Sequence, residues 1–429
     1  KIFLIAVGLL LAFGIYSCED KFLDEEENYL IDSESYFNSE DDYYLALVGA
    51  YDLLQATYVN NLLGEIASDN TLCGGESATD VVGFQQIDDM IHTPVNSNLR
   101  DIWNWMFAGV KRVNYFLEFK DRTDFDGREI MVAEVRFLRA YYHFELVKWF
   151  GGIPIKNYQD ALNGAGKRFA PGDETSVQRY SESEVYALIE SDLIFAVNTL
   201  DYTAPQIGRV TKGAAQALLG KAYLYQDKFS QAADVFMDLI DNGPYQLASD
   251  YNQIFELEGE NNVESVFEVQ YTDGEGAGFG CLQCSEGNVA VGFMGIRNHT
   301  GPVYDSGYSF NVPLEASYNA YQEGVVRRDV SILDIVAWAE ATGATYVEGY
   351  EHTGYYNRKY LARKGDQNIG DQNLTNPNNY RSIRYADVLL MAAESLNRGG
   401  IDDSQALAYL NQVRERAFGN SNSNISASG

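Results

Sequence analysis

The sequence predicts a mainly α-helical fold, in which a loop-rich lobe with short strands is inserted into a scaffold of repeated helix pairs. Three observations predict it. Apolar residues recur at the spacing of one helix face over much of residues 39–260 and again over 380–418. Residues 211–244 match a helix-pair repeat. Between them lies a lobe at about 261–380, much of it rich in Gly, Asn and aromatic residues, without a sustained helical period.

Residues 211–244 carry the pattern of a tetratricopeptide repeat. Gly220 and Ala232 are small where two antiparallel helices would touch, and the aromatic residues of the pattern would fill the groove on either side. Thr211 is a suitable N-cap, and Asn242-Gly243-Pro244 would end the second helix. The alternative is an ordinary hairpin with accidental matches. The matching positions are Leu219, Gly220, Tyr223, Ala232, Phe236 and Pro244, while Gln216 replaces the leading tryptophan.

The other elements follow from apolar spacing and capping residues. Asp126 with Glu129, and Ser181 with Glu184, have the spacing of a capping box at the start of a helix. The predicted helices are 39–57, 99–120, the segment from Asp126 to Gly151-Gly152, 181–200, and a final pair at 384–397 and 403–417 capped by Asp402 and Gln405; loops are predicted at 60–98 and 157–180, and a strand at 263–271.

Composition bounds the class of protein. With 429 residues and a hydrophobic share of 46%, the chain can bury a large core and is globular. Its net charge of -31 argues against a nucleic-acid partner, because phosphate binding needs a basic face. The 31 tyrosines suit a surface that stacks on ringed ligands, although many will lie in the core.

The N-terminus predicts export and lipidation. Lys1 precedes an apolar run of 15 residues, which is short for a membrane span and typical of a signal peptide. The following Ser17-Cys18 completes a sequence that resembles a bacterial lipobox, with Tyr16 a loose fit. We therefore predict a signal peptide at 1–17, a tether lipidated on Cys18 at 18–38, and one domain at 39–429. The alternative is an ordinary cleaved secretory signal.

Several stretches together resemble the SusD/RagB family of Bacteroidetes outer-membrane lipoproteins. Each is modest alone, but the ordered set covers essentially the whole chain. The stretches are FLRAYYHFELVKWFGGIPI (137–155), GRVTKGAAQALLGKAYLY (208–225), NVESVFEVQY (262–271), TGYYNRKY (353–360), IRYADVLLMAAESLN (383–397) and LNQVRERA (410–417).

The resemblance implies a right-handed scaffold of about four tetratricopeptide-like helix pairs with a loop-rich face. Members of the family sit on the cell surface, anchored in the outer membrane by a lipid, over a TonB-dependent transporter of the SusC type. They capture a nutrient, usually an oligosaccharide or polysaccharide, for import. On this resemblance the scaffold would face the transporter and the lobe would face the ligand.

Glycans are bound by aromatic rings that stack on sugar faces and by polar side chains that bond the hydroxyls. Three predicted loops, 69–86, 271–308 and 338–356, combine both residue types. For each aromatic residue the alternative is packing in the core or within the lobe. The candidate ligand-binding residues are Asp69, Asn70, Phe84, Phe279, Arg297, Tyr304, Trp338, Tyr346 and Tyr350.

Other chemistry has little support. Cys281-x-x-Cys284 favours a local disulfide, or a bridge from either cysteine to Cys73, over a zinc site, because the four histidines are scattered. No cofactor is predicted, and a structural cation in the lobe is left open. Residues 274–280 predict a flexible loop rather than a phosphate-binding one, because no helix follows.

The sequence leaves four functions in order. The first is a surface lipoprotein that captures glycans for a SusC-like transporter, without catalysis. The second captures peptides or another non-glycan nutrient, and the third is a helical-repeat scaffold that binds only proteins. A surface glycosidase comes last, because no hydrolase motif is present and 62 acidic residues make chance carboxylate pairs common.

Overall fold

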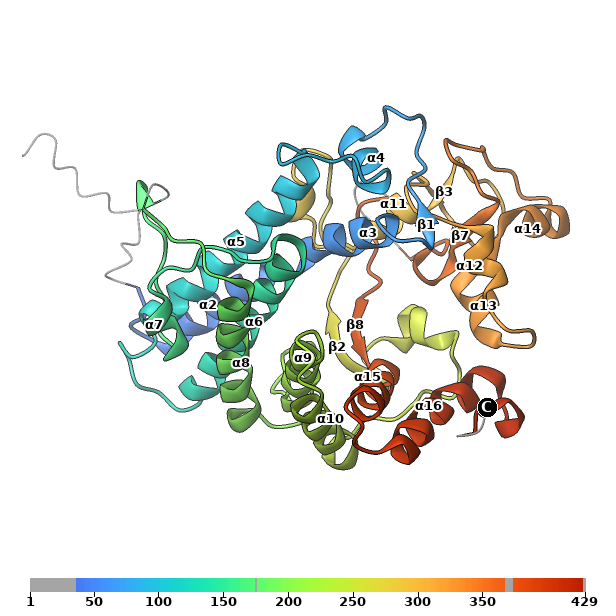
Figure 1. Ribbon diagram of the computed structural model, residues 1–429. Helices are drawn as coiled ribbons and strands as arrows, with labels where there is room; N and C mark the ends of the chain where they lie inside the picture. The colour runs from blue at the N-terminus through green and yellow to red at the C-terminus, as the bar shows by residue number, and fades with distance from the viewer. Residues whose placement is uncertain (1–35, 174–175, 367–372, 427–429) are drawn as a thin grey trace, which may run out of the picture.

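Eight long helices form the scaffold in the computed structural model, which describes residues 36–173, 176–366 and 373–426. Each packs against the next along the chain, so they stack as four consecutive pairs (Figure 1). This arrangement confirms the predicted helical-repeat scaffold. The helices are α2 (Glu40–Asp52), α5 (Ser97–Glu118), α6 (Arg128–Phe150), α8 (Glu182–Thr199), α9 (Lys212–Leu224), α10 (Phe229–Asn242), α15 (Tyr385–Arg398) and α16 (Asp403–Phe418).

The α9–α10 hairpin has the predicted geometry. Thr211 caps α9, because its Oγ1 accepts a hydrogen bond from the Ala214 amide at 3.2 Å. A Cβ atom at Gly220 would lie 2.5 Å from the Phe236 ring, so only glycine allows the two helices to approach this closely. Helix α10 ends at Asn242, as predicted. The repeat pattern therefore reports a true helix contact.

Three local predictions need correction. The loop predicted at 60–98 contains most of α3 (Tyr58–Ile66) and all of α4 (Val82–Asp88), because Asn60, Asn61 and Gly64 hide an apolar helical face in the sequence. The loop at 157–180 contains the short α7 (Tyr158–Leu162). The capping box at Asp126 is absent. The chain instead enters α6 through Gly127 with φ 85°, and no side chain caps the helix.

The lobe consists of short elements joined by loops (Figure 1). The predicted strand is β2 (Ser265–Val269), which pairs antiparallel with β8 (Tyr380–Arg384) and connects the lobe to the scaffold. The other described pairs have two or three residues a strand: β1 (Thr71–Leu72) with β5 (Val312–Pro313), β3 (Ile296–Arg297) with β4 (Ser306–Gly307), and β6 (Ile332–Asp334) with β7 (Tyr355–Asn357). Its short helices are α11 (Ala290–Met294), α12 (Glu315–Asn319), α13 (Val326–Ser331) and α14 (Ile335–Thr342).

Buried ion pairs hold the scaffold together. Asp192 of α8 is fully buried and accepts from Arg136 Nε and Arg139 Nε of α6, each at 2.7 Å. Glu264, just before β2, is also fully buried and lies between Arg384 Nη1 and Arg416 Nη1, each at 2.6 Å. The first set joins the second helix pair, and the second set joins the base of the lobe to α16.

We expect Asp192→Asn to lower the free energy of unfolding by about 3 kcal/mol, because two buried guanidinium groups would lose their counter-charge. Urea denaturation followed by circular dichroism measures this change. Asp234→Asn, on an exposed turn of α10, removes the same charge without a buried partner and should change stability by less than about 0.5 kcal/mol. Equal effects of the two substitutions would contradict the structural role of Asp192.

We expect Gly220→Ala to destabilise the protein by about 1–3 kcal/mol, because the added methyl group would overlap the Phe236 ring. Gly49→Ala is the matched control. Its Cβ would meet nothing within 4 Å on α2, so it should leave stability unchanged or raise it by up to about 1 kcal/mol. The order of the two thermal midpoints decides the point.

Candidate ligand-binding site

Three loops far apart in the sequence meet at one place, which we call the loop junction and define as residues 73–80, 308–310 and 349–350. The Gly75 amide donates to the Ser309 carbonyl at 2.9 Å, and the Tyr350 amide donates to the Gly75 carbonyl at 2.9 Å. Each of the three loops predicted to carry ligand residues contributes to or borders this junction. The structure therefore brings together what the sequence left separate.

Glycines allow the three backbones to touch. A Cβ at Gly74 would lie 2.1 Å from the Ser309 carbonyl oxygen, and one at Gly349 would lie 2.4 Å from the Gly75 carbonyl oxygen. Gly75 also has φ +108°, a conformation that other residues rarely adopt. The Gly74-Gly75 pair is the local signal of this junction in the sequence.

The surface around the junction is aromatic and polar. Phe279 is 59% exposed, and its ring centroid lies 5.8 Å from that of the half-buried Tyr308. Tyr350 is half-buried, and a hydrogen bond to Glu351 raises the pKa of its hydroxyl. Asp80 accepts from the Glu76 amide at 2.9 Å. Flat apolar faces thus lie among carboxylates that accept hydrogen bonds.

Two predicted residues are core side chains. Phe84 is 3% exposed and packs edge-on against Phe310, with ring centroids 5.6 Å apart. Tyr304 is 2% exposed, and its hydroxyl accepts from Arg358 Nε at 2.9 Å. Neither presents a ring face to a ligand here, so both are corrected to the packing role that was the alternative for each aromatic residue.

Arg297, Trp338 and Tyr346 also lie partly inside the lobe. Arg297 braces the junction, because its guanidinium donates to the Ser309 hydroxyl at 3.0 Å and to the Tyr308 carbonyl at 2.6 Å. Trp338 packs on Tyr304, and both Trp338 and Tyr346 border the lobe core rather than the junction. Their chief contacts are structural.

Asp69 and Asn70 are exposed and stand away from the aromatic surface. The Asn70 carbonyl accepts from the Leu314 amide at 2.9 Å and from the Ser317 hydroxyl at 2.8 Å, which ties the chain after α3 to α12. Asn70 also lines a groove described below. Of the nine candidates, only Phe279 and Tyr350 lie at the loop junction with part of the side chain exposed.

The cysteines settle into one of the predicted arrangements. Cys281 and Cys284 form a disulfide in the loop that carries Phe279, and Cys73 is a free, buried thiol. Burial, followed by the charge of Asp88, raises the pKa of that thiol. In the described part of the chain, no three His, Cys, Asp or Glu side chains come together as a potential metal site.

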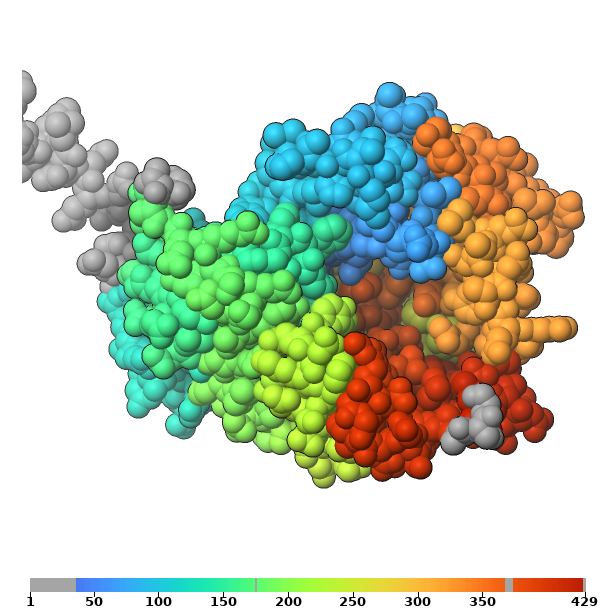
Figure 2. All heavy atoms as spheres, viewed as in Figure 1, coloured from blue at the N-terminus to red at the C-terminus, as the bar shows by residue number. Residues whose placement is uncertain are grey.

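A large groove separates the scaffold from the lobe, and the sequence did not predict it. Its cavity measures about 1070 Å³ and lies between α9, α15 and α16 on one side and α12 and α13 on the other. It is visible as the hollow at the centre of Figure 2. A second cavity of about 410 Å³ shares Glu65, Tyr360 and Tyr380 with it. The lining comes from separate segments, so no local pattern marks it.

Comparisons with known proteins identify the family. Residues 21–224 match a family described as "Starch-binding associating with outer membrane", and residues 334–427 match the "SusD family". A solved laminarin-binding SusD-like protein is 32% identical, with a TM-score of 0.80 over 91% of this chain and 86% of its own. This chain belongs to the SusD/RagB family. The resemblance seen in the sequence is confirmed.

Other SusD/RagB relatives span the same length. Surface glycan-binding protein A from Bacteroides thetaiotaomicron, solved in complex with laminarihexaose, is 26% identical with a TM-score of 0.77, over 90% of this chain and 84% of that one. SusD-like protein P2 from Formosa agariphila is 27% identical over 95% of this chain and 80% of its own. Among the described residues, no helix has the length and apolar character to cross a membrane.

We expect Gly74→Ala to open the loop junction, because its Cβ cannot fit against the Ser309 carbonyl. Hydrogen exchange at the Gly75 and Tyr350 amides should then speed up at least tenfold, while exchange in α9 stays slow. Gly278→Ala is the control, since its Cβ would meet nothing within 4 Å in the neighbouring loop. Unchanged protection in Gly74→Ala would show that the junction does not depend on this contact.

Proposed function

We propose that this protein captures an oligosaccharide at the loop junction on the outer surface of the cell and passes it to a SusC-like TonB-dependent transporter. One observation carries the proposal. The junction gathers the aromatic rings of Phe279, Tyr308 and Tyr350 beside the carboxylates of Asp80 and Glu76 on one surface. These are the two kinds of group that sugar recognition needs.

The physical basis is a division of labour between the two kinds of group. An aromatic ring buries the apolar face of a pyranose, and a contact of this kind contributes about 0.5–1.5 kcal/mol beyond the area it buries. Carboxylates accept hydrogen bonds from sugar hydroxyls and fix the orientation of the ring. The glycine contacts and the Cys281–Cys284 disulfide hold the loops, so less entropy is lost when a ligand binds.

Relatives support a glycan as the ligand and suggest the first probe. One solved relative is named for laminarin binding, and another was solved with laminarihexaose. These are properties of those proteins, but both share most of their length with this chain. A laminarin-type β-glucan is therefore the first ligand to test, ahead of peptides.

Capture without catalysis fits this role. The residues described above offer stacking and hydrogen bonding, and the named relatives are binding proteins. Lipidation at Cys18, which lies outside the described residues, would anchor the protein to the outer membrane. The scaffold would then stand against the transporter and the loop junction would face the glycan.

We expect laminarin in a native gel to retard the protein without releasing new reducing ends. Phe279→Ala and Tyr308→Ala should each weaken binding about three- to tenfold, because each removes a stacking surface of about 0.5–1.5 kcal/mol. Tyr44→Ala, on α2 and remote from the junction, is the matched control and should bind normally.

Three results would change the proposal. New reducing ends would establish a glycosidase. Retardation by none of a panel of plant, fungal and host glycans, together with binding of peptides, would favour capture of a peptide nutrient. If the protein bound neither glycan nor peptide but still co-purified with the transporter, a protein-binding scaffold would be favoured.

A further inference from the structure

The groove between scaffold and lobe reverses the charge balance of the chain. The whole sequence has 62 acidic and 31 basic residues, a ratio of two to one. The charged side chains that line the groove show the opposite ratio, because six are basic and three are acidic. The basic ones are Lys221, Arg327, Lys359, Arg381, Arg384 and Arg414; the acidic ones are Glu65, Asp387 and Glu394.

Three of these cations form no ion pair with any described carboxylate: Lys221 at the end of α9, Arg327 of α13 and Lys359 just after β7. All three are half-buried. Arg384, by contrast, lies 2.6 Å from the buried Glu264. A half-buried cation without a counter-charge is costly, so the three provide electrostatic free energy to an incoming anion.

A buried tyrosine next to the groove reports the same field. Tyr251 packs edge-on against Phe255, which lines the groove, with ring centroids 5.4 Å apart. Burial alone would raise the pKa of its hydroxyl, but Lys359, Arg384 and Arg327 lower it to about 8. Cations from three separate segments therefore act on one point.

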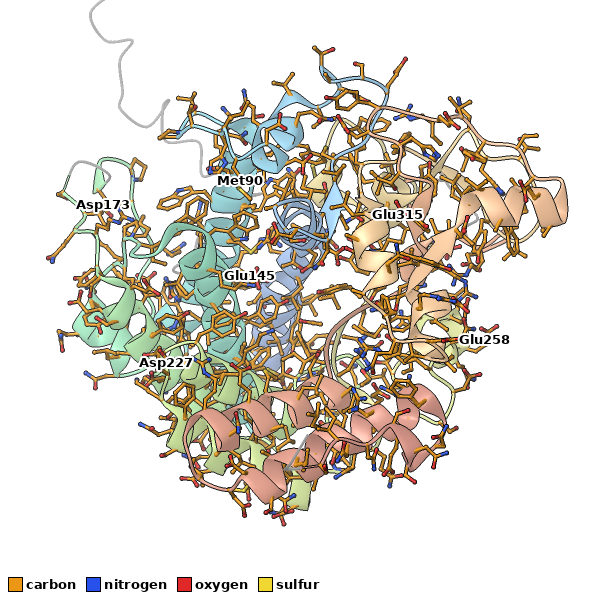
Figure 3. All side chains as sticks on the ribbon, turned by 45° about the vertical axis from the view of Figure 1, so that its right-hand side comes forward. Met90, Glu145, Asp173, Asp227, Glu258 and Glu315 are labelled. Carbon is orange, nitrogen blue, oxygen red and sulfur yellow. A yellow bond between two sulfur atoms is a disulfide. The ribbon has the colours of Figure 1, made fainter. Side chains whose placement is uncertain are left out.

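Aromatic rings accompany the positive charge. Tyr225 is 54% exposed at the end of α9, and its ring rests edge-on against Phe144 at 5.4 Å. Tyr321 stands on the lobe side, where Arg327 lies 5.9 Å above its ring. Figure 3 shows α12, marked by Glu315, and α6, marked by Glu145, on opposite sides of this space. A cavity of about 1070 Å³ is at the upper end of small-ligand sites and accommodates several sugar units.

We infer that the groove is a second binding site, separate from the loop junction, for an oligosaccharide that carries carboxylate or sulfate groups. Arg327 and Lys359 bind an anionic group from the lobe side, and Lys221 binds from the scaffold side. Tyr225 offers a ring face for the sugar between them. The inference does not rest on the proposed function of the loop junction, because the two sites share no residue.

Titration calorimetry with tetragalacturonate as the probe tests the second site. Binding should weaken at least fivefold in each of Lys221→Gln, Arg327→Gln and Lys359→Gln, and in Tyr225→Ala. It should also weaken with added NaCl, which screens such contacts. Lys111→Gln, on an exposed turn of α5 outside the groove, is the matched control and should bind like the unaltered protein. Lys359→Arg keeps the charge and should retain binding.

The two sites fail independently. The groove variants should leave laminarin retardation unchanged, and Phe279→Ala should leave tetragalacturonate binding unchanged. Four outcomes would overturn the inference: no tetragalacturonate binding, equal losses in Lys111→Gln and the groove variants, equal affinity for neutral laminaritetraose, or full competition by sulfate alone at the concentration of the sugar. Tighter binding of a hexaglutamate peptide than of tetragalacturonate would instead identify the groove as a docking site for an acidic protein segment.

Discussion

The structure depends on one helix that has no exposed face through its centre. Every residue of α6 from Met131 to Val147 is buried, including charged side chains. Charges at that depth are tolerated only with partners, so Arg139 is matched by Asp192 of α8 and Glu134 by Arg209. Burial, and then the charge of Arg139, lowers the pKa of His143 to about 4, which keeps that side chain neutral. Helix α6 therefore fixes its neighbours on all sides.

From that centre, the scaffold holds the lobe by a narrow connection. Strands β2 and β8 carry the chain out and back, and Glu264 binds Arg384 and Arg416 at the base. The groove walls are thus set by scaffold helices on one side and by the lobe on the other. The loop junction lies elsewhere and is set by glycine contacts between loops. One frame in this way supports two surfaces of different chemistry.

Charge separates the two surfaces. The chain as a whole is strongly acidic, and the junction follows this character with Asp80 and Glu76. The groove concentrates unpaired cations between low-dielectric walls, where a field is focused rather than screened. Neutral sugars suit the first surface, and anionic sugars suit the second. A SusD/RagB protein built in this way can discriminate between glycans by charge as well as by shape.

Sequence alone determined the elements that depend on near neighbours: the repeat at 211–244, the Ser181 capping box and the final helix pair, because their patterns recur within a few turns. It also determined the family. Only the tertiary structure decided which aromatic residues are exposed. Phe84 and Phe279 look alike in sequence, yet Phe84 is buried by Phe310 while Phe279 is left on the surface. The groove, whose cations come from separate segments, likewise exists only once long-range packing has brought them together.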